Sequence, residues 1–191
     1  MNMKNFQIIA SNVDVLPLLL AIKRQPELWK EDTYLRDYPQ SPFAQIESIM
    51  LRFPVKSVKE TEAEVTDHFS KYDQHESINY PAFQLLPQAR PLIMGLMARV
   101  DGERLGRVMI NKIAPGGVIY PHEDTPAHTE YYSRFHLVLQ SEPGVIFRAG
   151  DEQFNMQTGQ LIWFDNSQMH EVINNSNQDR ISMVIDVRCL K

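Results

Sequence analysis

The alternation of hydrophobic and polar positions changes its period once along the chain, near residue 106. Before that point, apolar residues within 88–100 recur at the three-to-four-residue spacing of a helix, and Gly102 is expected to end this helix. After that point, apolar residues occupy every second position and turn residues recur at short intervals. The first part of the chain therefore predicts mixed helices and strands, and the second part predicts β structure alone.

The second half contains five segments with strand periodicity, and Gly, Pro and Asn residues mark the turns between them. The helix within 88–100 is expected to cover the outside of the resulting sheet. Residues 56–80 show no sustained apolar period and are expected to form surface structure or a mobile flap. Strands are expected at 6–10, 48–53, 107–113, 133–140, 145–149, 160–164 and 180–187, and a further helix at 15–24.

Short strands separated by regular turns are typical of an antiparallel barrel or sandwich. The 191 residues are enough for one well-filled core, so we expect a single domain, 1–191. Within this domain, residues 1–86 would supply an N-terminal helix, strands and lid elements. Residues 87–191 would supply the supporting helix and the β core that carries the chemistry.

Composition excludes several classes of protein. The formal net charge of -5 provides no cationic field for phosphates, which argues against general nucleic-acid binding. Cys189 is the only cysteine, so an internal disulfide and a thiolate metal cluster are both excluded, and a reducing, cytoplasmic location is expected. The apolar run 13–22 is interrupted by Asp14 and Pro17 and is too short to span a bilayer, so we expect no membrane association.

One predicted strand has an unusual distribution of polar residues. Within 133–140, Arg134 and His136 share one face, whereas Phe135 and Leu137 share the other. A half-buried strand normally turns its polar face to water, but a strand of a barrel can turn that face toward a ligand. We therefore interpret the interior of the barrel as a ligand-binding cavity.

Three residues form a candidate metal site. His122 and Asp124 make an H-x-D triplet at the end of a strand-like segment, where residues two apart point to the same side. His170 follows a polar turn between two apolar segments. Each feature alone is more often a solvated turn or a surface histidine. Together they provide two imidazoles and one carboxylate, the ligand set that holds Fe(II) on one face.

Arg180 begins the last predicted strand, and Ser182 is the next residue on the same face. An isolated arginine at a strand end usually lies on the surface. A guanidinium that points into a cavity, however, can bind a carboxylate through two parallel hydrogen bonds. Such an arginine beside a metal site would suit the far carboxylate of 2-oxoglutarate.

The region from His122 to Val187 resembles the core of the aspartyl/asparaginyl β-hydroxylases and of the related bacterial proline hydroxylases. This resemblance implies a mainly β protein, a double-stranded β-helix of the jelly-roll or cupin-like type with flanking α-helices. It also implies a dioxygenase that depends on Fe(II) and 2-oxoglutarate. The stretches that carry the resemblance are Arg134-Phe135-His136-Leu137, Phe164-Asp165-Asn166-Ser167 leading to His170-Glu171-Val172, Asp179-Arg180-Ile181 and Ile185-Asp186-Val187.

By this resemblance, iron would be bound by His122, Asp124 and His170. Some animal members of the family lack the carboxylate ligand, so Asp124 resembles the bacterial pattern. The substrate implied is a free amino acid, an Asp or Asn side chain of a peptide, or a related small molecule, which is hydroxylated with dioxygen.

The same resemblance assigns residues to the co-substrate. Arg180, with Ser182 beside it, would bind the far carboxylate of 2-oxoglutarate. Arg134 and His136 would contact the carboxylate beside the ketone, and Asn111 would occupy a further co-substrate position.

Two other interpretations stay open. A cupin-like metalloenzyme that does not use 2-oxoglutarate would share the metal ligands and add a third histidine, for which His128 or His136 is available. A non-catalytic β-barrel binding module would retain the motif without its chemistry. The sequence does not indicate the substrate or the oligomeric state.

Overall fold

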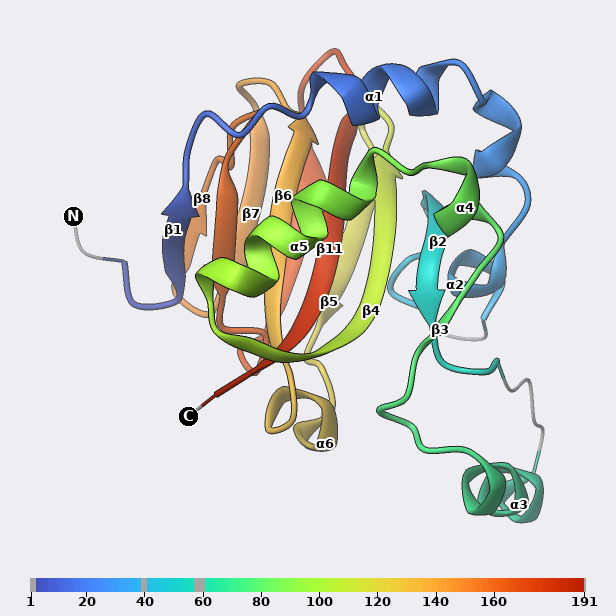
Figure 1. The fold of residues 1–191 in the computed structure, drawn as a ribbon. Coiled ribbons are helices and arrows are strands. Elements are labelled where there is room, and N and C mark those ends of the chain that lie inside the picture. Colours follow the sequence, from blue (N-terminus) through green and yellow to red (C-terminus); the bar gives the residue numbers. More distant parts are fainter. Residues whose placement is uncertain (1–2, 39–40, 57–60, 191) are drawn as a thin grey trace.

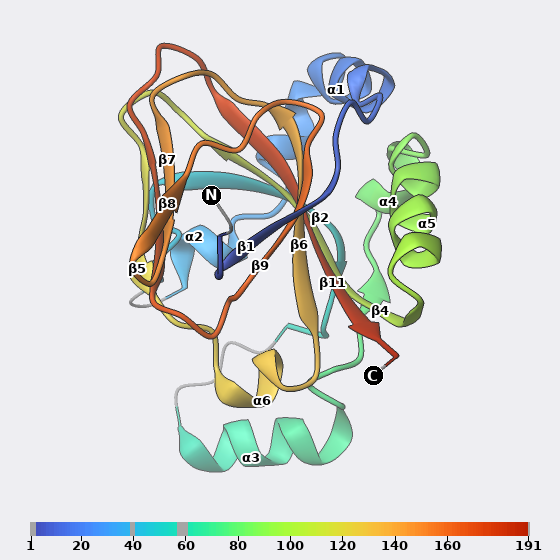
Figure 2. The ribbon, with the colours of Figure 1, turned by 90° about the vertical axis from the view of Figure 1, so that its left-hand side faces the viewer.

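Two antiparallel sheets face each other in the computed structural model, which describes residues 3–38, 41–56 and 61–190 (Figures 1 and 2). The larger sheet has seven strands in the order β1-β9-β6-β11-β4-β2-β3, and the smaller has four in the order β5-β10-β7-β8. The strands are β1 Phe6–Ala10, β2 Ile46–Phe53, β3 Ile78–Asn79, β4 Gly102–Ile113, β5 Val118–His122, β6 Ser133–Gln140, β7 Val145–Ala149, β8 Glu152–Phe154, β9 Leu161–Phe164, β10 His170–Asn174 and β11 Arg180–Cys189.

Helices cover the face of the larger sheet that points away from the smaller one. Figure 2 shows α1, α4 and α5 on that side, as expected for the helix within 88–100, and shows α3 and α6 at one end of the two sheets. The helices are α1 Leu16–Lys23, the 3-10 helix η1 Pro26–Trp29, α2 Tyr34–Asp37, α3 Glu62–Lys71, α4 Ala82–Leu85, α5 Ala89–Arg99 and α6 Pro126–Thr129. No helix within the described ranges is long and apolar enough to cross a membrane.

Both faces of the larger sheet are buried, and each packs into its own core. On β6, Phe135, Leu137 and Leu139 pack against residues of α1 and α5 in the helix-covered core. Val138 packs between the two sheets. The alternation along β6 therefore directs Arg134 and His136 into the space between the sheets, as the sequence pattern predicted.

The expected mainly β fold is confirmed, and β1, β6 and β7 have the predicted bounds. The expectation that Gly102 ends the preceding helix is wrong, because α5 ends at Arg99 and Gly102 already begins β4. Asp101 adopts the left-handed conformation, with φ 50°. A glycine is required at 102 because a Cβ atom there would lie 2.8 Å from both the Met97 sulfur and a Val187 methyl carbon.

The expectation that everything after residue 106 is β is also wrong, because α6 interrupts that half. Pro126 occupies the start of α6, where its missing N–H costs nothing.

The segment from 61 to 80 is more ordered than its weak periodicity indicated. Thr61 and Glu64 form a reciprocal capping box at the start of α3. Residues 57–60 of the expected surface segment 56–80 lie outside the described residues.

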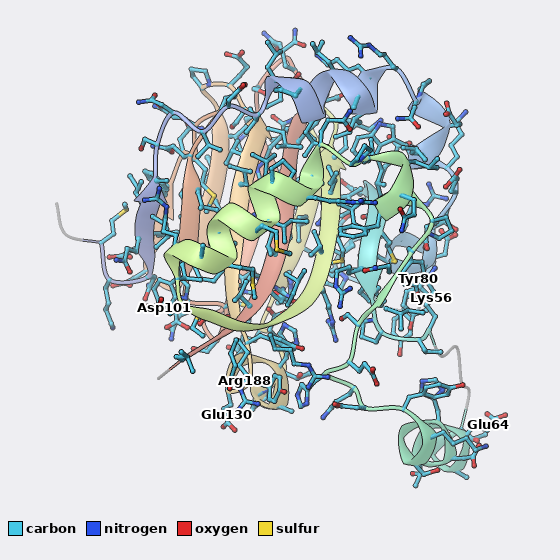
Figure 3. The ribbon with its side chains drawn as sticks, in the orientation of Figure 1. Lys56, Glu64, Tyr80, Asp101, Glu130 and Arg188 are labelled. Atoms are coloured by element: carbon cyan, nitrogen blue, oxygen red, sulfur yellow. The ribbon has the colours of Figure 1, made fainter. Side chains whose placement is uncertain are left out.

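The larger sheet includes strands from both halves of the chain. β1 pairs with β9, and β2 pairs with β4 through a register that places Ser48 opposite Asn111. The sheet therefore crosses the division expected at residue 86. At this edge Lys56 lies over the Tyr80 ring, with its ammonium 5.0 Å from the ring centroid, well apart from α3 and Glu64 (Figure 3).

Candidate metal centre and the pocket around it

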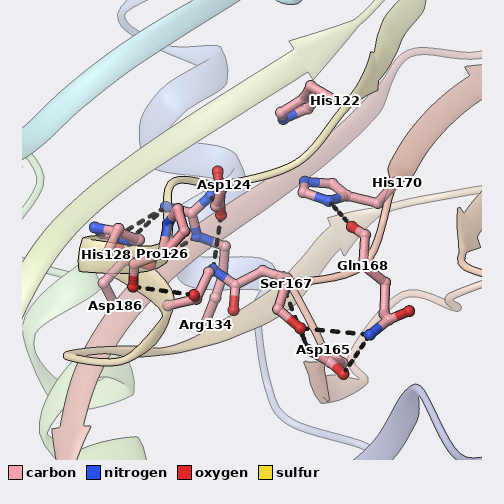
Figure 4. Close-up of polar contacts among 12 residues, drawn as sticks. His122, Asp124, Pro126, His128, Arg134, Asp165, Ser167, Gln168, His170 and Asp186 are labelled. Carbon is pink, nitrogen blue, oxygen red and sulfur yellow. Dashed lines mark hydrogen bonds and ion pairs between the residues drawn. The ribbon is translucent and has the colours of Figure 1, made fainter.

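The two predicted histidine ligands lie opposite each other on adjacent strands. His122 ends β5 and His170 begins β10, and the register of these two strands pairs the two residues directly. Their ring centroids are 4.2 Å apart. The smaller sheet thus aligns both imidazoles at one end (Figure 4).

Each imidazole is held by its Nδ1 atom. The Nδ1 of His122 lies 2.7 Å from the Tyr120 carbonyl oxygen, and the Nδ1 of His170 lies 2.8 Å from the Gln168 carbonyl oxygen. A carbonyl oxygen can only accept, so both Nδ1 atoms carry the proton and both Nε2 atoms keep a free lone pair. The Nε2 of His122 is buried and has no hydrogen-bond partner among the described residues. This arrangement is the one that metal-binding histidines adopt.

Asp124 completes the group. One ligand atom from each of His122, Asp124 and His170 lies within 4.8 Å of the others. The Oδ2 atom of Asp124 accepts hydrogen bonds from Arg134 Nη1 at 2.6 Å and from Asn166 Nδ2 at 2.7 Å. The Asp124 backbone N–H also donates to the Asn166 carbonyl oxygen. Oδ2 is therefore occupied by hydrogen bonds within the protein, which leaves Oδ1 available to bind a ligand.

Arg134 links this carboxylate to a second, deeper one. Its Nε and Nη2 atoms donate to the two oxygens of Asp186 at 2.7 and 3.0 Å, while Nη1 donates to Asp124. Asp186 is fully buried, and His128 Nε2 lies 3.0 Å from its Oδ2 atom. Figure 4 shows the resulting chain of contacts from Asp186 through Arg134 to Asp124.

The charges of this network set the protonation of the site. Burial would raise the pKa values of Asp124 and Asp186, but the Arg134 guanidinium, together with the hydrogen bonds from Asn166 to Asp124 and from His128 to Asp186, outweighs burial and holds both pKa values below their usual range. Burial lowers the pKa of His122; burial and the neighbouring His122 lower the pKa of His170 to about 4. At neutral pH the site therefore presents a carboxylate and two neutral imidazoles. This is the protonation state that a divalent metal requires.

The metal-ligating group opens into a pocket between the two sheets. The pocket has a volume of about 580 Å³ when the part open to solvent is included. Its walls are largely apolar, and Leu35 and Phe43 of the expected lid segment contribute to them. The lining residues are Leu35, Phe43, Phe53, Arg107, Met109, Asn111, Ile119, His122, Asp124, Arg134, His136, Phe147, Phe164, His170, Val172 and Val184.

Arg180 lies deeper than the pocket walls and is 1% exposed. Its guanidinium faces the Phe147 ring at 5.8 Å from the ring centroid, and Nη2 lies 3.9 Å from the Met156 sulfur. Its Nε and Nη1 atoms have no hydrogen-bond partner in the described part of the chain. Burial lowers the pKa of Arg180 to about 10. This side chain is thus a buried cation that no carboxylate of the described residues pairs with.

The other predicted co-substrate residues lie near the metal-ligating group or on neighbouring strands. Register places Ser182 beside Asn111, and the Ser182 hydroxyl is fully buried and unpartnered among the described residues. Asn111 accepts a hydrogen bond from the Ser48 hydroxyl at 2.9 Å. His136 is buried, its Nδ1 has no hydrogen-bond partner among the residues that the structure describes, and burial lowers its pKa well below the usual value. Arg134 is committed to Asp124 and Asp186, so its contact with 2-oxoglutarate stays a prediction.

Three positioning residues escaped the sequence reasoning. Asp186, His128 and Asn166 contact Arg134 or Asp124, whereas the sequence pattern gave Asp186 and Asn166 no role and offered His128 only as a possible third metal ligand. Asp186 carried a signal, because it is the one charged residue within the apolar run 181–187. Such a residue in a buried strand needs a partner. Asn166 and His128 carried no such signal, since both lie in polar segments.

Solved structures share this architecture. An oxidoreductase of the 2OG-Fe(II) oxygenase family from Burkholderia pseudomallei is 17% identical, with 85% of this chain and 78% of that chain covered and a TM-score of 0.50. A viral collagen prolyl hydroxylase from Paramecium Bursaria Chlorella virus-1, solved as a 2OG complex, is 12% identical, with 98% and 97% covered and a TM-score of 0.50. At these identities the likeness shows the fold. The fold is the jelly-roll type shared by these oxygenases.

Family membership follows from the sequence itself. No curated protein matches the chain. The model of the aspartyl/asparaginyl beta-hydroxylase family matches residues 56–189, which is more than half of the chain. The chain therefore belongs to the aspartyl/asparaginyl beta-hydroxylase family, and the protein is an enzyme of the hydroxylase class.

Proposed function

We propose that this hydroxylase is a dioxygenase that depends on Fe(II) and 2-oxoglutarate and adds a hydroxyl group to an unactivated C–H bond of a small-molecule or peptide substrate. The observation that carries the proposal is Arg180. The metal-ligating group alone would suit a cupin-like enzyme equally well. A fully buried guanidinium with two unpartnered nitrogens is costly unless a carboxylate pairs with it, and 2-oxoglutarate supplies that carboxylate.

His122, Asp124 and His170 would hold the iron. Two neutral imidazoles and one carboxylate fit Fe(II) in donor type and number, and each has a free donor atom. When bound together, iron and 2-oxoglutarate activate dioxygen for hydroxylation, with succinate and carbon dioxide as the other products.

The protein's own contribution to the metal site is orientation. The carbonyl oxygens of Tyr120 and Gln168 fix the proton on the Nδ1 atoms, so neither histidine has to change tautomer when metal binds. Arg134 and Asn166 hold one oxygen of Asp124, which directs the other oxygen to the side of the histidines. Asp186 in turn fixes the plane of the Arg134 guanidinium.

Arg180 would pair with the far carboxylate of the co-substrate, and Ser182 would donate its hydroxyl proton to the same group. Both side chains share one face of β11 and both have unpartnered donors among the described residues. We propose that His136 and Arg134 contact the carboxylate beside the ketone, and that Asn111 lies along the co-substrate. The neutral state of His136 supports this role, because a neutral imidazole can donate one hydrogen bond without adding charge.

The apolar walls of the pocket would exclude water. Ile119, Phe147, Phe164 and Val172 surround the metal-ligating group from both sheets. Exclusion of water strengthens the polar contacts inside and protects a reactive site from side reactions. We also propose a reducing, cytoplasmic compartment, which the free thiol of Cys189 supports.

Turnover tests this proposal directly. Purified protein is incubated with Fe(II), ascorbate, 2-oxoglutarate and a panel of amino acids, peptides and lysate metabolites, and succinate is measured by NMR. We expect succinate that depends on both iron and oxygen, and a product heavier by one oxygen atom in the mass spectrum. Conversion of a panel substrate that proceeds without 2-oxoglutarate would instead identify a cupin-like metalloenzyme.

A further inference from the structure

Arg107 is a second arginine of the barrel interior that forms no ion pair with the described residues. Arg107 lies on β4 and lines the pocket together with the metal-ligating residues. Its guanidinium stacks over the Phe53 ring, 5.1 Å from the ring centroid. No carboxylate of the described residues forms an ion pair with it, although Asp124 and Asp186 are near enough to affect its pKa. Burial lowers the pKa of Arg107, so the cation is held partly out of water at a cost.

The charges inside the barrel leave this cation unbalanced. Arg107, Arg134 and Arg180 face the interior, whereas the only carboxylates there among the described residues are Asp124 and Asp186. Arg134 pairs with both carboxylates. The interior therefore has one positive charge in excess. Because the charges of Fe(II) and doubly ionised 2-oxoglutarate cancel, the same excess stays when both are bound.

Arg107 and Arg180 lie at different depths of the barrel and do not affect each other. Arg180 pairs in register with Ile113, the last residue of β4, and Arg107 lies six residues earlier on that strand. A strand rises about 3.3 Å per residue, so the two backbone positions are roughly 20 Å apart along the sheet. Arg107 lines the pocket whereas Arg180 does not, and neither guanidinium contributes to the shift of the other's pKa. Arg107 is therefore assigned to a different anion from the carboxylate that Arg180 would bind.

The residues around Arg107 limit which other chemical groups a bound anion can have. Leu35, Phe53, Met109 and Val184 form the wall on its side of the pocket. Asp124 is the only carboxylate among the lining residues that the structure describes, and it faces the histidines. The wall thus offers apolar contact but no acidic group for a substrate ammonium.

We propose that Arg107 binds the carboxylate of the substrate, and that the substrate is a carboxylic acid with a hydrocarbon body and no free ammonium group beside the carboxylate. This inference rests on the proposed function, because it assigns the substrate end of the same pocket. A guanidinium binds a carboxylate through two parallel hydrogen bonds, and the Phe53 ring beneath it keeps the guanidinium in one plane. Arg107 is thus a specificity-determining residue.

Matched acids and amides test the proposal by equilibrium binding. The probes are butanoate, 4-methylpentanoate and phenylacetate, each paired with its primary amide, and L-leucine as the acid that carries an ammonium. Dissociation constants are measured by calorimetry on anaerobic Fe(II)-loaded protein, with and without 2-oxoglutarate. We expect at least one acid to bind the parent protein about 30-fold or more tightly than its amide, and L-leucine to bind more weakly than 4-methylpentanoate.

Three variants identify the residue responsible. Arg107→Met should abolish the preference for acid over amide, and Arg107→Lys should keep part of it, since an ammonium cannot make the two-pronged contact. Arg90→Met is the matched control, because the Arg90 guanidinium also lies over a phenylalanine ring, at 5.3 Å from the Phe83 centroid, but outside the pocket. This control should keep the full preference.

The outcomes separate the inference from the proposed function. If the parent shows no preference for any acid, or if Arg107→Met retains the preference, Arg107 is not the substrate site. If Arg107→Met weakens 2-oxoglutarate as strongly as an Arg180 variant does, Arg107 belongs to the co-substrate and the inference is wrong. If the parent does not bind 2-oxoglutarate at all, the proposed function fails, whereas the acid and amide titrations with iron alone still test Arg107. Should Arg107→Met fold poorly, Arg107→Lys keeps the cation and provides the measurement.

Discussion

Replacement of Arg180 by methionine should stabilise the protein and abolish co-substrate binding at the same time. Arg180 is fully buried, and no described carboxylate pairs with it. The fall of its pKa from 12.5 to about 10 corresponds to a cost of about 3 kcal/mol for the charged form, because each pKa unit is worth about 1.4 kcal/mol. Methionine has an unbranched chain that suits the space beside Met156 and Phe147. Its introduction removes the buried charge.

The variant should be more stable than the parent but should bind 2-oxoglutarate more weakly. Without 2-oxoglutarate, Arg180→Met should raise the free energy of unfolding by about 1 to 3 kcal/mol. Loss of one partner of a buried ion pair costs about 2 to 5 kcal/mol of binding, so the dissociation constant for 2-oxoglutarate should rise roughly 30-fold to several thousand-fold. At 100 times the parent's dissociation constant, 2-oxoglutarate should add about 2.7 kcal/mol to the stability of the parent and less than about 1 kcal/mol to that of the variant.

Urea unfolding and calorimetric titration of anaerobic, Fe(II)-loaded protein measure both effects. Arg148→Met is the control, because the Arg148 side chain is 47% exposed and pairs with Glu171 at the surface. This control should change stability by less than about 1 kcal/mol and leave co-substrate binding intact. Iron content should be the same in all three proteins, since Arg180 is not a ligand. A variant that is less stable than the parent without 2-oxoglutarate, and that binds 2-oxoglutarate equally well, would refute the reasoning.

Three further variants test the metal site by elemental analysis. His170→Ala should lose iron, since one histidine and one carboxylate make a poor site for a labile divalent ion. His68→Ala on α3 is the control. Equal iron content in the two variants would place the metal elsewhere, with His128 as the next candidate. Asp124→Ala should lose iron while Glu123→Ala, which removes an exposed carboxylate, should keep it; the reverse result would overturn the H-x-D assignment. Asn166→Ala should weaken iron binding about 10- to 100-fold, because Asp124 loses the amide that holds its Oδ2 atom; unchanged affinity would show that Arg134 alone orients the carboxylate.

The strands of the core were predictable because their side chains alternate between two environments. On β6, Phe135, Leu137 and Leu139 face the helices, whereas Arg134 and His136 face the pocket, so the pattern indicates both the strand and its orientation. The three candidate metal ligands were predictable for a related reason, because two imidazoles and one carboxylate are informative by type. Their convergence, however, depends on the pairing of His122 with His170, which no local pattern reveals.

The unpredicted features depend on contacts between segments far apart in the sequence. The Arg134 to Asp186 pair is set by the register of β6 against β11, in which the two residues lie directly opposite. From the sequence, Arg107 was recognised only as the beginning of a strand. That no described carboxylate forms an ion pair with it can be seen only when the positions of β2, β4 and the two interior carboxylates are known. The start of α3 was missed for a different reason, because Thr61 and Glu64 have the local spacing of a capping box but no apolar period follows them.

The central claim is that iron and 2-oxoglutarate bind together in this pocket, and an anaerobic titration tests it most directly. Fe(II)-loaded protein is titrated with 2-oxoglutarate while the visible absorption spectrum is recorded. Chelation of iron by a 2-oxo acid gives a weak charge-transfer band, so the account predicts a band that saturates in the parent protein and that is absent when His170→Ala has removed the iron. A parent protein that binds iron but develops no band at any concentration of 2-oxoglutarate would contradict the account.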